Sequence, residues 1–194
     1  LLYDDVQKSF KDKGLHLPKD KQKKLASIAK TMSELGSTFT KNIADFDASI
    51  LCTKEELSGL PETFIQNLKR DSKTKKYIVS IAYPELGPFS TFADNHTKRK
   101  ELIDKSSQKG GKGNIKILQE LLKLRHNYAE ILGYDSYAAF SVKDRMSKNP
   151  ARVQTFLEST LASLKTSVFA DVKKVASFAK SEYGISKLDY SNAK

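Results

Sequence analysis

The sequence predicts a mainly α-helical fold, with long antiparallel helices in a bundle-like array and one very small β element. Two long stretches repeat apolar residues every three or four positions, which is the period of an amphipathic helix. A third stretch is apolar around most of its circumference, as in a helix buried between neighbours. Only one short segment has the β-branched and aromatic composition of a strand.

The composition is that of a globular chain with a substantial core. Of the 194 residues, 39% are hydrophobic and 29% are charged, and no apolar run approaches the roughly 18 residues that a membrane span needs. Cys52 is the single cysteine, and its neighbours Ile50 and Leu51 favour a buried, unreactive thiol. We therefore expect no membrane association and a cytoplasmic, reducing location.

The net charge of +11 permits nucleic-acid binding, but its distribution argues against it. Lysines far outnumber arginines and are spread along the whole chain, and no aromatic residues interleave with the densest lysine runs. Base and phosphate recognition favours arginine forks and stacking platforms. A solvated, lysine-rich surface is the interpretation that we favour.

The first half of the chain begins with a predicted short helix over residues 3–13 and a long helix over about 18–49. Pro18 suits the first helical position, since its missing N–H would have no partner there. Gly36 inside the long helix costs about 1 kcal/mol, which the apolar stripe should offset. The stripe consists of Leu25, Ile28, Met32, Leu35, Phe39, Ile43, Phe46 and Ile50.

A small β and turn region is predicted over about residues 50–88. Thr53 and Glu56 have the spacing of a capping box and open a short helix that ends at Gly59. A second helix runs from Pro61 to about Arg70, and a polar turn follows it.

The strand candidate of this region is residues 77–83, with residues 50–52 as its only plausible partner. Pro84 and Pro88 then predict an extended turn.

The last part, residues 89–194, is predicted to be helical. We expect a helix over 89–107, a flexible loop over 108–113, and a helix capped by Asn114 and ended by Gly133. Two apolar rows of that helix predict burial on both sides: Ile117, Leu121, Leu124, Tyr128 and Ile131 in one, and Ile115, Leu118, Leu122, Ala129 and Leu132 in the other.

Two further helices complete the prediction. A shorter one covers residues 136–145, and a long one begins at Pro150 after Asn149 and closes at Gly184. The stripe of the long helix consists of Val153, Phe156, Leu157, Leu161, Leu164, Val168, Val172, Val175 and Ala179.

The sequence contains no recognisable motif of metal-binding, phosphate-binding or catalytic residues. His16, His96 and His126 lack local metal-binding partners, and the zinc motif H-E-x-x-H does not occur. The glycines of residues 108–113 lack the spacing of a phosphate-binding loop. Paired carboxylates such as Glu55-Glu56 and Asp4-Asp5 are typical of helix N-termini or surfaces. We therefore predict no catalytic, cofactor-binding or metal-binding residue.

Several segments, in order, resemble one family of zinc metallopeptidases. Residues 14–18 (GLHLP) are similar to G-x-x-L-P, residues 56–61 (ELSGLP) to E-L-x-G-L-P, and residues 77–84 to a strand before a proline. Residues 95–101 resemble E-N-x-x-x-R-E, and residues 124–134 (LRHNYAEILGY) are the most specific match. The family is that of thimet oligopeptidase, oligopeptidase A and dipeptidyl carboxypeptidase.

The resemblance implies a helical piece of a larger peptidase. In that family the zinc-binding H-E-x-x-H, a later Glu ligand and the substrate-gripping residues lie downstream of the matched region. Asp94, Lys98 and Lys100 depart from the family pattern as tolerable surface changes. The start at Leu1 and the resemblance together predict that residues 1–194 form one helical fragment of a larger metallopeptidase, with no cofactor of its own and zinc in the parent enzyme.

Two functions remain open on these residues. The first is a non-catalytic helical wall of the substrate channel of a zinc-dependent oligopeptidase, whose partners are the rest of the parent chain and short peptides. The alternative is a stand-alone helical protein-interaction module. If the chain is an excised piece, former interfaces exposed as apolar patches could drive formation of a dimer.

Overall fold

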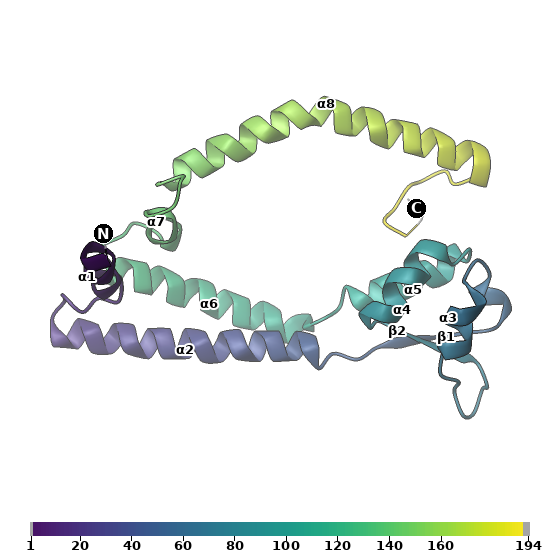
Figure 1. Cartoon of the computed structure of the whole chain (residues 1–194), viewed down its shortest axis with the longest axis horizontal. Helices are drawn as coiled ribbons and strands as arrows, with labels where there is room; N and C mark the ends of the chain where they lie inside the picture. The colour runs from purple at the N-terminus through teal and green to yellow at the C-terminus, as the bar shows by residue number, and fades with distance from the viewer. Residues whose placement is uncertain (1, 192–194) are drawn as a thin grey trace. The chain divides into compact units, whose positions relative to one another are not determined.

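The computed structural model describes residues 2–191, and they form two compact units that are each built from two separate stretches. The first unit combines the residues up to 44 with residues 110–164, and the second combines residues 45–109 with those from 165 onward. The described residues are mainly helical, with one two-stranded sheet (Figure 1). The prediction of a mainly α fold with a very small β element is confirmed.

The first unit is centred on two antiparallel helices, α2 (Lys19–Ala44) and α6 (Gly111–Ile131), which lie side by side in Figure 1. The predicted stripe of α2 from Leu25 to Phe39 faces α6, and Leu25 is fully buried. The facing side chains of α6 are half-buried: Ile117, Leu121, Leu124, Tyr128 and Ile131. The helices therefore pair through the apolar rows that their periodicity predicts.

Helix α2 ends at Ala44, earlier than the predicted end at about residue 49. The apolar spacing continues through Phe46 and Ile50, but both belong to the second unit. Ile50 is a buried residue of a strand, and Phe46 packs against the core of that unit. The spacing of three or four residues therefore continues from α2 into the following strand, so it does not mark the end of the helix.

Asn114 does not cap α6, contrary to the prediction. The helix begins at Gly111, and its N-cap is Gly110 in a left-handed conformation (φ 80°). Asn114 is instead buried between the two helices, where its Oδ1 accepts a hydrogen bond from Asn42 Nδ2 (2.8 Å) and its Nδ2 donates to the carbonyl of Phe39 (3.0 Å). Asn114, which the sequence predicts as a helix cap, thus forms a polar link between α2 and α6.

The second apolar row of α6 is covered only in its last part. The row that faces α2 is half-buried, but Ile115, Leu118 and Leu122 of the second row are between 44% and 58% exposed. The prediction that both sides of this helix are buried is therefore wrong for the first turns of the second row, whereas Ala129 is fully buried and Leu132 half-buried as predicted.

Two short helices complete this unit, α1 (Leu2–Asp12) and α7 (Tyr137–Val142). Asp12 accepts from Lys143 Nζ (2.8 Å), and Lys8 Nζ lies 2.6 Å from Asp144 Oδ1, so ion pairs join α1 to the segment after α7. Helix α7 starts where predicted, because the side chain of Ser136 accepts a hydrogen bond from the N–H of Ala139.

The second unit contains the sheet, in which β1 (Ser49–Cys52) pairs antiparallel with β2 (Tyr77–Ser80). The predicted pairing is confirmed, with Cys52 opposite Tyr77 and Ile50 opposite Val79. Cys52 is fully buried, and burial raises the pKa of its thiol to about 11. This thiol stays protonated at neutral pH, as a structural rather than reactive cysteine does.

The capping box between the strands is formed. The N–H of Thr53 donates to Glu56 Oε2 (2.8 Å), and the N–H of Glu56 donates to Thr53 Oγ1 (3.4 Å). It opens only one turn of 3₁₀-helix, η1 (Glu55–Leu57), and α3 (Glu62–Asn67) ends before the predicted Arg70.

The predicted extended turn at Pro84 and Pro88 is wrong, since both prolines belong to α4 (Tyr83–Phe92). Pro84 lies in the first turn, where its missing N–H loses no partner, and Pro88 removes one bond from the helix interior. Phe89 is fully buried in the core next to Pro88, and this burial favours the helix. The predicted helix over 89–107 is therefore divided, and α5 (His96–Ser106) is a separate helix.

Helix α8 (Pro150–Tyr183) is the longest helix that the structure describes, and it contributes residues to both units. The side chain of Asn149 accepts from the N–H of Arg152 (2.9 Å) at its start, and Gly184 (φ 66°) follows its end, as predicted. None of the helices within residues 2–191 has the length and apolar character needed to cross a lipid bilayer.

Replacing Asn114 with alanine should lower the free energy of unfolding by about 1–3 kcal/mol, because the half-buried side-chain amide of Asn42 then loses its acceptor. Urea unfolding followed by circular dichroism measures the change. Asn127→Ala, on the exposed side of the same helix, is the matched control and should change it by less than about 0.5 kcal/mol. Equal effects of the two substitutions would contradict the polar link.

Candidate functional site

The histidines are separated in the structure, and none lies in a metal-binding cluster. His16 and His126 are exposed in the first unit, and His96 begins α5 in the second. Within residues 2–191 no three His, Cys, Asp or Glu side chains gather closely enough to hold a metal ion. The described side chains therefore do not fit a zinc ion, and the predicted lack of catalytic, cofactor-binding and metal-binding residues stays a prediction.

The paired carboxylates have the structural places that the sequence predicts. Asp4 and Asp5 lie in the first turn of α1, and Glu56 completes the capping box described above. Two of the loop glycines, Gly111 and Gly113, belong to α6 instead of a loop. Among the described residues, none of these belongs to a group that could hold a metal ion, and none lines the best-formed pocket.

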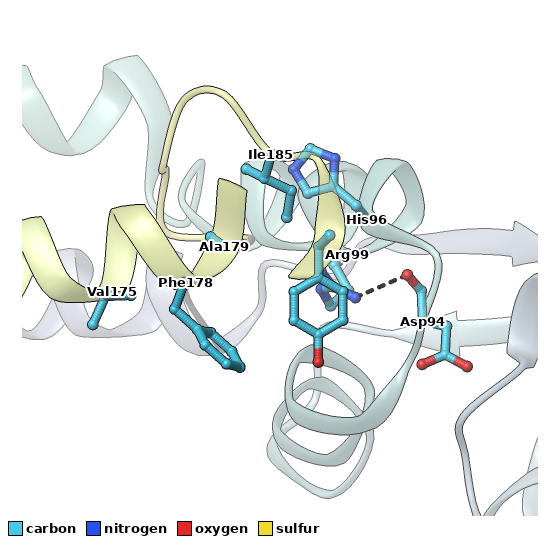
Figure 2. Close-up of a pocket in the computed structure, with 8 residues that line it drawn as sticks. Asp94, His96, Arg99, Val175, Phe178, Ala179 and Ile185 are labelled. Carbon is cyan, nitrogen blue, oxygen red and sulfur yellow. Dashed lines mark hydrogen bonds between the residues drawn. The ribbon is translucent and has the colours of Figure 1, made fainter. Parts of the chain in front are cut away.

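The best-formed pocket lies within the second unit and has a volume of about 430 Å³. Figure 2 shows Asp94, His96 and Arg99 on one side, and Val175 and Phe178 of α8 on the other. Ala179, Tyr183 and Ile185 complete the lining. The pocket is thus mainly apolar, with a few polar groups at one end, which is a common composition of ligand pockets.

The polar end of the pocket is held by the turn between α4 and α5. Asn95 caps α5 by accepting from the N–H of Lys98 (3.0 Å), and the N–H of Asp94 donates to the carbonyl of Ser58 (2.8 Å). Gly59 (φ 87°) allows this approach, because a Cβ atom there would lie 2.3 Å from the carbonyl oxygen of Phe92. Gly59, which the sequence predicts as a helix end, therefore also allows the α4–α5 turn to pack closely against it.

Arg99 is the buried charge of this region, with 3% of its surface exposed. Its Nη1 donates to the carbonyls of Ala93 and Asp94, and its Nε donates to the carbonyl of Ser191 (2.7 Å). Figure 2 marks the bond to Asp94. Burial lowers the pKa of the guanidinium, but an arginine keeps its charge in proteins. A single side chain thus ties the α4–α5 turn to the end of the described chain.

A second set of contacts holds the same terminal segment on α5. Ser191 Oγ donates to Asp189 Oδ1 (2.5 Å) and lies 2.9 Å from His96 Nε2. One turn further along α5, Tyr190 donates to Asp104, which also pairs with Lys100 (2.8 Å). The hydrogen bonds from Ser191 hold the pKa of Asp189 below its usual value of 3.8.

Serine, histidine and aspartate meet here, but not in the order of a catalytic triad. A triad needs the carboxylate on histidine Nδ1 and the serine on Nε2. Asp189 instead accepts the serine proton itself, and its nearest approach to His96 is to Nε2, at 3.8 Å. The arrangement secures a chain segment and does not activate a nucleophile.

Sequence reasoning missed the roles of Arg99 and of the terminal segment. The segment after Gly184 carries no periodic signal, and Arg99 stood out only as one position of a family motif. Lys98, interpreted as a surface change, is half-buried and donates to the carbonyl of Leu51 (3.0 Å) and to Glu101. The one feature of the sequence that could have pointed to Arg99 is that it is an arginine among lysines near an Asn cap. This feature does not by itself indicate burial.

Comparisons with known proteins match this chain to peptidases. The model of peptidase family M3 matches residues 89–190, which is just over half of the chain. Oligopeptidase A of Escherichia coli (strain K12) is 29% identical over 199 residues, covering 95% of this chain. Thimet-like oligopeptidase of Dictyostelium discoideum is 33% identical over 77% of the chain, and saccharolysin of Saccharomyces cerevisiae is 32% identical over 78%.

The chain is a mainly helical one whose sequence matches peptidases. The chain belongs to peptidase family M3, whose members are zinc metallopeptidases. It spans 29% of the length of oligopeptidase A and 22% of the length of saccharolysin. The resemblance noted in the sequence is confirmed by these matches.

Replacing Arg99 with methionine should lower the free energy of unfolding by about 2–4 kcal/mol, because three carbonyl oxygens lose a charged donor. Urea unfolding measures the loss, and trypsin cleavage after Lys187, read by mass spectrometry, should become faster as the terminal segment detaches. Arg152→Met, on the exposed surface of α8, is the control and should leave both values unchanged. Unchanged cleavage in Arg99→Met would contradict the tie.

The terminal segment should also detach at low pH. Because the pKa of Asp189 is depressed in the folded chain, its contribution is complete above pH 4 or so and is lost as pH falls through the lower, folded value. The amide of Ser191, which donates to Asp189 (2.8 Å), reports the transition by NMR. We expect a midpoint below 3.8 that disappears in Asp189→Asn. A midpoint above the usual value would show that these hydrogen bonds do not form in solution.

Proposed function

We propose that this chain forms a non-catalytic helical wall of the substrate channel of a zinc-dependent oligopeptidase. The observation that carries the proposal is the ordered match of 95% of the chain to oligopeptidase A. The remaining length of that relative has no counterpart here, and the sequence lacks the H-E-x-x-H that the family resemblance implies for the parent enzyme. The reaction catalysed by the parent would be hydrolysis of short peptides.

The architecture of the first unit supports a scaffold role. The paired helices α2 and α6 are long and amphipathic, and the buried Asn42–Asn114 link fixes them in one register. A polar pair that is satisfied in only one alignment favours a unique arrangement of helices. Such a pair can serve as a rigid side of a channel without contributing to the chemistry.

Uncovered apolar rows on this unit support a place within a larger protein. The exposed row of α6 contains Ile115, Leu118 and Leu122, and α1 exposes a second row. Isolated surface leucines are ordinary, but rows at helical spacing mark faces that pack on further segments. The α1 row consists of Leu2, Tyr3, Val6 and Phe10, which are between 43% and 78% exposed.

The same rows also fit the alternative, a stand-alone helical protein-interaction module. The two proposals predict the same fold but different reading frames in the gene. An open reading frame that continues beyond Lys194 into H-E-x-x-H supports the channel wall, whereas a stop codon directly after it supports the module.

The purified chain should contain substoichiometric zinc and should not hydrolyse quenched-fluorescence peptides, because its described side chains offer no metal cluster. Elemental analysis and a fluorescence assay measure the two properties, with intact oligopeptidase A as the positive control. Stoichiometric, tightly bound zinc together with hydrolysis would refute the non-catalytic role.

A chimera tests the wall itself. The chain replaces the 199-residue segment of E. coli oligopeptidase A to which it aligns. We expect the chimera to keep its zinc and to hydrolyse peptides with an altered KM, because a wall changes substrate fit and not the metal site. A chimera that folds and binds zinc with every peptide's KM unchanged would remove this segment from the channel.

A further inference from the structure

A small pocket of the second unit is lined mainly by positively charged side chains. It has a volume of about 360 Å³ and lies where β1 ends and β2 begins. Four of its seven described lining residues are basic, and none of the seven is acidic. They come from the residues after β1, from the turn between α3 and β2, and from the start of β2: Thr53, Lys54, Arg70, Thr74, Lys75, Lys76 and Tyr77.

The turn between α3 and β2 has a hydrogen-bonded backbone. Its two sides pair, since the N–H of Asp71 donates to the carbonyl of Lys76 (2.8 Å) and the N–H of Ile78 donates to that of Lys69 (2.8 Å). At the tip, Asp71 Oδ1 accepts from the N–H of Thr74 (2.7 Å) and from the Thr74 hydroxyl (2.7 Å). The polar turn that the sequence predicts therefore holds the backbone of its lysines in fixed places.

Arg70 is positioned by the buried Tyr77 across this turn. An isolated antiparallel bridge pairs the two residues. The guanidinium carbon lies 4.3 Å from the centre of the Tyr77 ring, and Arg70 Nη2 donates to the Tyr77 hydroxyl (2.6 Å). A guanidinium has a planar fork of N–H donors, so it keeps donors for an oxyanion after this bond is made. Tyr77 is 9% exposed, and its hydroxyl still has a proton to donate.

The carboxylates that are close in the sequence to these lining residues are bound by other groups. Hydrogen bonds from Thr74 hold the pKa of Asp71 below its usual value of 3.8. Glu56 accepts from the N–H of Thr53 in the capping box, and a hydrogen bond from the Thr53 side chain lowers the pKa of Glu55. Within the described residues, the four basic side chains of the pocket form no ion pair with a carboxylate.

The number of cations indicates the charge of a matching ligand. Like charges in one small pocket repel one another, and an anion between them offsets this repulsion. A single carboxylate would neutralise only one of the four. Each phosphoryl group brings about 1.5–2 negative charges at neutral pH, so a chain of two or three such groups matches the pocket. Lysine ammonium groups and an arginine fork are characteristic partners of phosphate oxygens.

We propose that this pocket binds a linear polyphosphate group, with Lys54, Arg70, Lys75 and Lys76 around its oxygens. This chemistry is shared by inorganic polyphosphate and by nucleoside diphosphates and triphosphates. The volume falls in the range of about 300–1,000 Å³ that is typical of small-molecule sites. The pocket belongs wholly to residues 53–77 of the second unit, so the proposal does not depend on the channel-wall role.

Isothermal titration calorimetry of the whole chain with inorganic tripolyphosphate, without divalent cations, tests the site. We expect saturable binding at one site. Lys76→Gln should raise the dissociation constant about 5- to 10-fold, because a charged hydrogen bond is lost. Lys73→Gln removes the same charge from the same turn but outside the pocket lining, and should change it less than about twofold. No saturable binding by the wild-type chain, or equal effects of the two variants, would overturn the proposal.

Arg70→Lys separates the arginine fork from its charge. The variant keeps the positive charge but loses the planar donors, so the dissociation constant for tripolyphosphate should rise about tenfold. Near-ultraviolet circular dichroism checks that the surroundings of Tyr77 are unchanged. An unchanged dissociation constant would remove Arg70 from the site and overturn the proposed geometry.

Further probes identify the source of the polyphosphate group. ATP that binds about tenfold more tightly than tripolyphosphate would support a nucleotide as the ligand, whereas equal or weaker binding of ATP would support inorganic polyphosphate. An oligoglutamate peptide supplies negative charge without phosphate. If it binds more tightly than tripolyphosphate, the polyphosphate assignment is overturned in favour of an acidic polypeptide segment.

Discussion

The requirement that amphipathic helices bury their apolar faces governs this chain. Helices α2 and α6 meet the requirement with each other, and the sheet, α4 and α5 meet it around one core. Among the described residues, apolar rows on α1 and α6 nevertheless remain exposed. These rows connect the fold to the proposed function, because they are faces on which further segments can pack.

In both units, buried polar groups select one arrangement of the packed segments. In the first unit a pair of asparagines fixes the alignment of two helices that apolar contacts alone would allow to slide. In the second unit Arg99 uses its charge on three backbone carbonyls. A buried guanidinium is stable only where its donors find acceptors, so the position of the terminal segment and the burial of Arg99 depend on each other.

Periodicity and punctuation in the sequence predicted most of the helices, the strand pair and the ends at Gly133 and Gly184. The predicted helix boundaries were wrong where one sequence pattern was compatible with two structural roles. The period of α2 continued through Phe46 into a strand, and Asn114 had the properties of a cap but serves a tertiary contact. The pocket around Arg99 brings together residues 94–99 and 175–185, and no local pattern records which distant segments meet.

Each unit is assembled from two stretches that the other unit separates in the sequence. During synthesis α2 therefore leaves the ribosome well before α6 exists, and an isolated amphipathic helix is only marginally stable in water. The segment that contains both strands, α4 and α5 emerges complete and can build its core first. Translation at about 5–20 residues per second would thus leave the apolar face of α2 without its partner helix for several seconds.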